Sequence, residues 1–119
     1  MKGYVDLFII PVRKKDLKAY GSMARRYGKI ARDNGALEYR EFIAESIKPE
    51  WAPPISSKVK IKQGEVMVFA IAGFRSKAHR DVVNKKVMRD PRMKVLMALK
   101  PPFDMKRMLF EGFSTLLQA

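Results

Sequence analysis

Runs of apolar residues along the chain predict four β-strands. Tyr4 to Val12 (YVDLFIIPV) is rich in aromatic and β-branched residues, which favour a buried strand. Glu65 to Phe74 (EVMVFAIAGF) is almost continuously apolar, a pattern typical of a strand buried on both faces. Leu37 to Glu45 (LEYREFIAE) and Lys106 to Thr115 (KRMLFEGFST) are less regular and are predicted as the other two strands.

A long amphipathic helix is predicted between the first two strands. Apolar residues recur there at helical spacing, which places on one face Leu17, Tyr20, Ala24, Tyr27 and Ala31. Asp16 is a candidate N-cap in front of this stripe. Asn34 and Gly35 are the residue types that a left-handed helix end prefers, so the helix is expected to end there.

Two more helices are predicted between the third and fourth strands. Ser76 is the expected N-cap of the first, in which one face is shared at four-residue spacing by His79, Val83 and Val87. Asp90 followed by Pro91 places an N-cap before a proline at the first helical position. A separate short helix is therefore expected to run from there to about Leu99.

The element order is βαββαβ, with an extra short helix before the last strand, in one domain covering residues 1–119. This order predicts a ferredoxin-like α+β fold with a four-stranded antiparallel sheet and helices on one face. The segment Lys58 to Lys62 alternates lysine with apolar residues and could add a short edge strand guarded by lysines.

In the two central strands both the odd-numbered and the even-numbered residues are apolar. The face of the sheet that no helix covers is therefore also expected to be apolar. We expect one face to carry Val5, Leu7, Ile9, Val66, Val68 and Ala70. The other face is then expected to carry Phe8, Ile10, Met67, Phe69 and Ile71. Because a solvated apolar face of this kind is an association site, we expect a homodimer whose sheets pack face to face as a dimeric α/β barrel.

The charge of the chain adds a second candidate surface. The chain has 25 lysines and arginines against 12 aspartates and glutamates, a net charge of +13. Arg13 to Arg32 has eight basic residues against one acidic, and Arg75 to Lys100 has nine against two, so that each segment carries +7. In the first segment, one face of the predicted helix carries a basic stripe that could contact successive nucleic-acid phosphates: Lys18, Arg25, Lys29 and Arg32.

Composition also excludes several kinds of chemistry. The absence of cysteine excludes disulfides, zinc fingers, iron–sulfur clusters and thiol catalysis. A single histidine, His79, argues against a histidine-rich metal site, and neither a metal nor an organic cofactor is expected. No apolar run approaches the roughly 20 residues of a membrane span, and the chain start lacks a signal-peptide cleavage site. The expected location is the cytoplasm.

Four segments point to a known family: LEYRE at 37–41, FRSKAHRDVVNKKVM at 74–88, DPRM at 90–93 and PFDMKRM at 102–108. Together they resemble the YbaA-like family of small bacterial proteins of unknown function (domain of unknown function 1428). The resemblance implies the dimeric α/β-barrel fold and implies no reaction. Glu111 departs from the glycine that members usually carry, and IKPEWAPP at 47–54 replaces a stretch that is commonly acidic.

Five residues are candidates for a ligand-binding site: His79, Arg107, Asp6, Tyr39 and Glu41. His79 lies on the apolar face of its helix and is a weak candidate for a general acid or base, since imidazole titrates near pH 6.5. The alternative is a structural histidine. The four others would give an apolar cleft a polar end that orients a small ligand. Their alternative is an ion-pair network at the dimer seam, with Arg107 in a loop that fixes the entry to the last strand.

Three functions follow from this pattern. The favoured one is a homodimer that binds a small, partly apolar molecule, anionic or neutral, between sheet and helices; whether it catalyses a reaction is left open. One alternative is sequence-independent nucleic-acid binding through the basic helix layer. Another is a structural or stress-related dimer without a ligand. Base stacking as in an RNA-recognition domain is excluded, because Val66 to Ile71 lacks the required basic and glycine-aromatic pattern.

Overall fold

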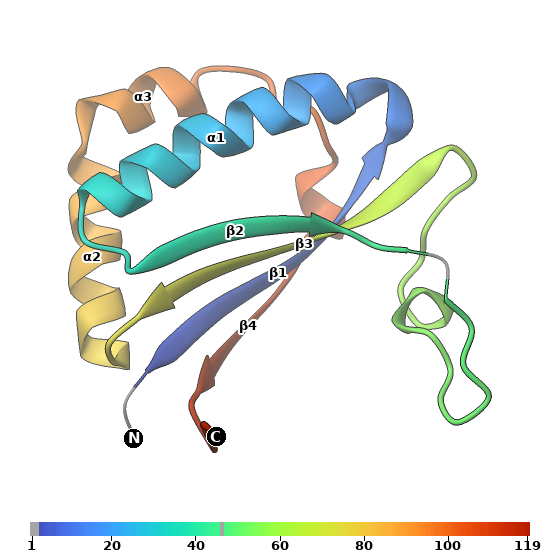
Figure 1. Ribbon diagram of the computed structural model, residues 1–119. Helices are drawn as coiled ribbons and strands as arrows, with labels where there is room; N and C mark the ends of the chain where they lie inside the picture. Colours follow the sequence, from blue (N-terminus) through green and yellow to red (C-terminus); the bar gives the residue numbers. More distant parts are fainter. Residues whose placement is uncertain (1–2, 46) are drawn as a thin grey trace.

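A single antiparallel sheet with helices on one side forms the protein in the computed structural model, which describes residues 3–45 and 47–119 (Figure 1). The four strands lie in the order β2 (Glu38–Ile43), β3 (Glu65–Phe74), β1 (Tyr4–Arg13) and β4 (Leu109–Ser114). The helices are α1 (Leu17–Asp33), α2 (Lys77–Arg89) and α3 (Pro91–Met97). The predicted α+β fold with a four-stranded antiparallel sheet is confirmed.

Strand register corrects the predicted division of the two faces. Phe8 pairs with Ala70 and Ile10 pairs with Val68. Directly paired residues of an antiparallel sheet project from the same face, so the even-numbered residues of β1 and β3 lie together. This face packs against the helices, and its buried members are Asp6, Ile10, Val12, Val68, Ala70, Ala72 and Phe74. Alternation along a strand divides its residues between two faces. Only the pairing of β1 with β3 decides which residues of the two strands share a face of the sheet.

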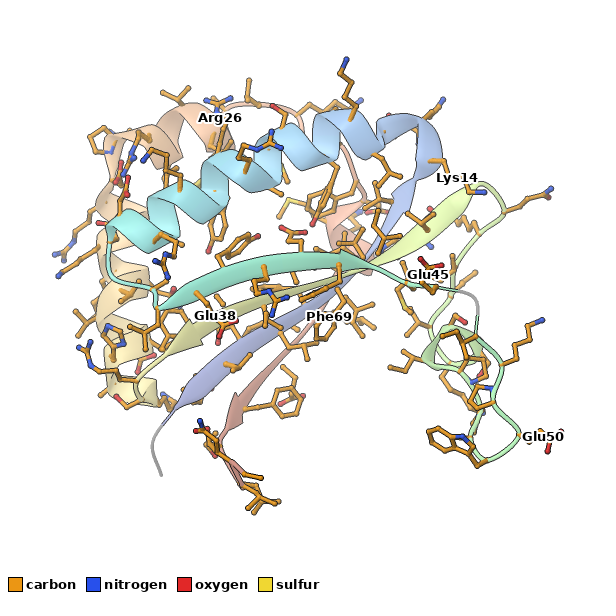
Figure 2. The ribbon with its side chains drawn as sticks, viewed as in Figure 1. Lys14, Arg26, Glu38, Glu45, Glu50 and Phe69 are labelled. Carbon is orange, nitrogen blue, oxygen red and sulfur yellow. The ribbon has the colours of Figure 1, made fainter. Side chains whose placement is uncertain are left out.

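The opposite side of the sheet, which we call the open face, is largely apolar, and no helix of the described residues lies over it (Figure 1). By register it carries Val5, Leu7, Ile9, Phe42, Met67, Phe69, Ile71, Leu109 and Phe113. Phe42, Leu109 and Phe113 are 37%, 50% and 49% exposed, so that a large part of this surface meets solvent in the single chain. Figure 2 labels Phe69 on the side of the sheet away from α1.

Most helix ends follow the predicted signals. Gly35 adopts a φ of +117° directly after α1, a conformation that glycine reaches without steric cost. Ser76 caps α2 by accepting a hydrogen bond from the His79 backbone N–H, and Asp90 caps α3 through the Arg92 N–H. Asp16 occupies the predicted N-cap position of α1, but its side chain makes no capping hydrogen bond: it ends a short 3₁₀ turn and accepts from the Arg13 guanidinium at 2.7 Å.

Two predicted strand segments are also corrected. Lys58 to Lys62 forms turns and irregular chain, not an edge strand. Its polar backbone groups bond to side chains: the Lys60 carbonyl accepts from Arg107, and the Lys62 N–H donates to Glu65. β4 begins at Leu109 rather than Lys106, because Asp104 caps a 3₁₀ turn over Met105–Arg107 that delays the strand.

Candidate functional site

A cleft of about 510 Å³ opens between α1 and β2, and we call it the α1–β2 cleft. Helix α1 presents small residues here, which keep its backbone close to the strand and leave space beside it: Gly21, Ala24 and Gly28. A Cβ added at Gly28 would come within 2.6 Å of the Tyr39 ring, whereas one added at Gly21 would meet nothing within 4 Å. The remaining lining residues are Leu17, Tyr20, Arg25, Lys29, Arg32, Tyr39, Glu41, Phe42, Ile43 and Val68.

Polar groups in the wall of the cleft converge on Glu41. The Tyr20 hydroxyl donates to Glu41 Oε1 at 2.5 Å, and the Tyr39 hydroxyl donates to Glu41 Oε2. Burial and then the neighbouring carboxylate raise the pKa values of both phenols above the usual 10, so both keep their protons and act as donors. The two tyrosines come from different elements, α1 and β2, and they hold the carboxylate in one orientation.

Three cationic side chains of α1 line the same cleft: Arg25, Lys29 and Arg32. Lys29 lies 3.4 Å from the Asp33 carboxylate in an exposed ion pair, and Arg32 donates to the Leu37 carbonyl. Within the described part of the chain, Arg25 forms no ion pair. Three of the four residues of the predicted basic stripe therefore belong to the cleft, which combines apolar walls, a held carboxylate and positive charge.

The structure does not gather the five predicted site residues into one place. Tyr39 and Glu41 meet in the cleft, but Asp6 lies between the sheet and α2, where it is 4% exposed. Its two carboxylate oxygens accept from Arg80 Nε at 3.1 and 3.0 Å. Asp6 therefore belongs to an ion pair within the chain that joins β1 to α2.

His79 lies in the first turn of α2, is half-buried and is not among the residues that line the cleft. Its Nδ1 accepts a hydrogen bond from the Arg75 backbone N–H at 3.0 Å, and its ring stands edge-on to Phe74. Burial and the nearby cations Arg75 and Lys86 lower the pKa of His79 below 6.5, which favours the neutral ring that this contact requires. Its contacts fit the structural alternative.

Arg107 forms a third separate group with Glu65. Its guanidinium donates to both carboxylate oxygens of Glu65, at 2.6 and 2.8 Å, and to the Lys60 carbonyl at 2.7 Å. These bonds tie the turn before β4 to the start of β3 and to the loop in front of it. These contacts fit the structural alternative for Arg107, in which it fixes the entry to the last strand.

Acid is expected to remove the stabilising contribution of the Arg107–Glu65 ion pair over a defined pH range. Hydrogen bonds from Arg107 lower the pKa of Glu65 from 4.5 to about 2, so the ionised form stabilises the folded chain above pH 4.5 and this contribution is lost as the pH falls toward 2. Urea unfolding between pH 7 and 2 measures it. The Glu65→Gln variant should be less stable at pH 7 by about 1–3 kcal/mol and show a shallower acid dependence. If the free energy of unfolding fell equally steeply with pH in the unmutated protein and in Glu65→Gln, this role of Glu65 would be contradicted.

Sequence reasoning missed three residues of these groups. Tyr20 was assigned to the apolar stripe of α1, and its hydroxyl reaches Glu41 only because the helix packs against β2. Arg80 and Glu65 carried no signal, since their partners lie 74 and 42 positions away in the chain. The one available indication was Asp6, a charged residue inside an apolar strand, because a buried carboxylate needs a cation beside it.

Within residues 3–45 and 47–119, no group of three or more histidine, aspartate or glutamate side chains could hold a metal ion. The same residues include no helix that is both long and apolar enough to cross a membrane.

The fold defines the class of the protein: a small α+β chain with a four-stranded antiparallel sheet and helices on one side. A solved structure, Rv0793 from Mycobacterium tuberculosis, has a similar fold, with a TM-score of 0.62, 98% of each chain covered and 10% sequence identity. That similarity concerns the fold alone.

Sequence similarity gives the family. The model described as "Protein of unknown function (DUF1428)" matches residues 3–105. The chain is 36% identical over 116 residues to "Uncharacterized protein YbaA" of Escherichia coli (strain K12), covering 96% of this chain and 97% of that protein. The corresponding protein of Shigella flexneri matches with the same identity and coverage. The chain belongs to the DUF1428 family, and the resemblance predicted from its motifs is confirmed.

Proposed function

We propose that the protein is a homodimer that binds a small amphipathic anion in the α1–β2 cleft. The observation that carries the binding proposal is the combination within one cleft of apolar walls, the Glu41 carboxylate held by two phenols, and three α1 cations.

The properties of the cleft support a ligand of this class. Its volume of about 510 Å³ falls in the range of small-molecule sites, which are about 300–1,000 Å³ and mostly apolar with a few placed polar groups. The apolar walls would take the body of the ligand. Arg25, unpaired in the described part of the chain, would attract its anionic group. Each oxygen of Glu41 can accept one more hydrogen bond, which would orient a donor group of the ligand.

The open face supports the homodimer. Nine apolar residues lie on it across all four strands, and none of the helices that the structure describes lies over them. Exposed apolar surfaces of this extent mark association sites in soluble proteins. A second copy would bring an identical apolar face, so two sheets packed face to face would remove both from water.

Binding is tested with 2-naphthoate, a rigid aromatic anion, and with its neutral counterpart 2-naphthamide, by isothermal titration calorimetry. We expect 2-naphthoate to bind at least about 10-fold more tightly than the amide, because a charge-assisted contact with Arg25 adds about 1.4 kcal/mol. Arg25→Gln should remove this preference and leave the weaker binding of the amide unchanged.

Gly21 supplies the matched control, since an added side chain enters open space in the cleft. Gly21→Ala should keep binding and stabilise α1 by about 0.5–1 kcal/mol, whereas Gly21→Phe should fill the cleft and reduce the affinity for both probes at least about 10-fold. No measurable binding of 2-naphthoate to the unmutated protein, or unchanged binding to Gly21→Phe, would overturn the proposal.

A further inference from the structure

Two opposite charges lie at the two edges of the open face. Arg40 is on β2 and Glu111 is on β4, the outer strands of the sheet. The register places them in one row: Arg40 pairs with Ile71, Ile71 with Leu7, and Leu7 with Glu111. The row therefore begins with a positive charge, crosses two apolar residues and ends with a negative charge.

Neither charge has an ion-pair partner in the part of the chain that the structure describes. Among residues 3–45 and 47–119, ion pairs include neither Arg40 nor Glu111, and both residues are exposed. The Arg40 guanidinium lies 4.7 Å from the centre of the Phe42 ring, so it rests on the apolar surface. If a second copy covers this face, both charges lose water and need partners of opposite sign.

Symmetry supplies partners for both charges in only one of two simple arrangements. Two identical sheets packed face to face are related by a two-fold axis between them, running either along the strands or across them. An axis along the strands places β2 over β4 of the second copy, so that Arg40 meets Glu111 at both edges. An axis across the strands places β4 over β4, where this face carries only Leu109, Glu111 and Phe113, so Glu111 meets no cation whatever the position of the axis. Aligned sheets lie about 10 Å apart, a gap that an arginine and a glutamate together can span.

We propose that Arg40 and Glu111 form two ion pairs between copies of this chain, and that these pairs select the two-fold axis parallel to the strands. The proposal rests on the homodimer proposed above and names the residues that determine its geometry. Recognition of a second copy then has two parts: the apolar rows drive association, and the charges at the edges select one orientation by penalising the other.

The test measures the dimer dissociation constant of charge-reversal variants by sedimentation equilibrium. Arg40→Glu and Glu111→Arg should each raise it at least about 10-fold, because each creates like-charge contacts at both edges. The double variant Arg40→Glu/Glu111→Arg should return to within about 3-fold of the unmutated protein. Glu38→Arg is the matched control: Glu38 is on the same face of β2, but its row contains only Gly73, Val5 and Phe113, so less than about a 3-fold change is expected.

The outcomes separate this proposal from the one it rests on. A monomeric unmutated protein would overturn the homodimer itself. A dimer whose dissociation constant is unchanged by either single reversal, or is not restored in the double variant, would overturn the ion pairs while the homodimer stands. Circular dichroism of each variant tests that the substituted chain is still folded when its dissociation constant is measured.

Discussion

Replacing Arg80 with alanine is expected to lower the free energy of unfolding by about 3 kcal/mol, because it leaves the Asp6 carboxylate buried without a cation. Asp6 is 4% exposed and receives both of its side-chain hydrogen bonds from Arg80. The same guanidinium lies 5.8 Å from the centre of the Phe110 ring, so the substitution also removes a packing contact between α2 and β4.

Asp81 provides the control, because it accepts from the same guanidinium at 3.1 Å but has a side chain that is 42% exposed. Asp81→Asn should lower the stability far less than Arg80→Ala, since exposed ion pairs contribute little. Urea unfolding at pH 7 measures both variants. Similar losses for Arg80→Ala and Asp81→Asn would mean that burial of Asp6 does not determine the strength of this pair.

Replacing Phe69 with aspartate is expected to convert the proposed homodimer into a folded monomer. Phe69 lies on the open face beside Phe42, with 5.6 Å between the ring centres, and a carboxylate there would be buried without a partner when two sheets meet. The dissociation constant should rise by at least about 100-fold. Light scattering at micromolar concentration should change from about twice 13.7 kDa to a single 13.7 kDa chain.

The adjacent residue gives the contrasting result. Val68 is 2% exposed and lies in the core beneath α1, so Val68→Asp should unfold the chain and abolish its far-ultraviolet helical signal. The two neighbouring substitutions thus distinguish loss of assembly from loss of fold. A Phe69→Asp protein that remains a dimer would show that the open face is not the interface between copies.

Local patterns in the sequence determined the elements and their order. Periodicity defined α1, since its apolar residues must lie on one side of a helix, and the glycine after Asn34 marked its end because only that position takes a positive φ there. Ser76 and Asp90 identified the starts of α2 and α3 for a similar reason, because a cap is a contact between residues two or three positions apart. Asp16 takes the N-cap position of α1 without a capping bond, and its carboxylate bonds instead to Arg13, which is equally close in the chain.

Part of the candidate site was also visible in the sequence. Tyr39 and Glu41 are two positions apart on one strand, and alternation alone places them on the same face, so their meeting could be predicted. His79, Arg107 and Asp6 could not be assigned in this way. The partners of the last two, Glu65 and Arg80, lie at distant positions, and many other charged residues were equally available to the unfolded chain.

Tertiary structure decided the rest through register and packing. Only the pairing of Ile10 with Val68 established which apolar rows face the helices and which form the open face. Only the close approach of α1 to β2 at Gly28 brought the Tyr20 hydroxyl to Glu41 and formed the cleft. The physical reason is the same in both cases: propensity and periodicity act over a few residues, whereas register and helix packing depend on the whole set of long-range contacts at once.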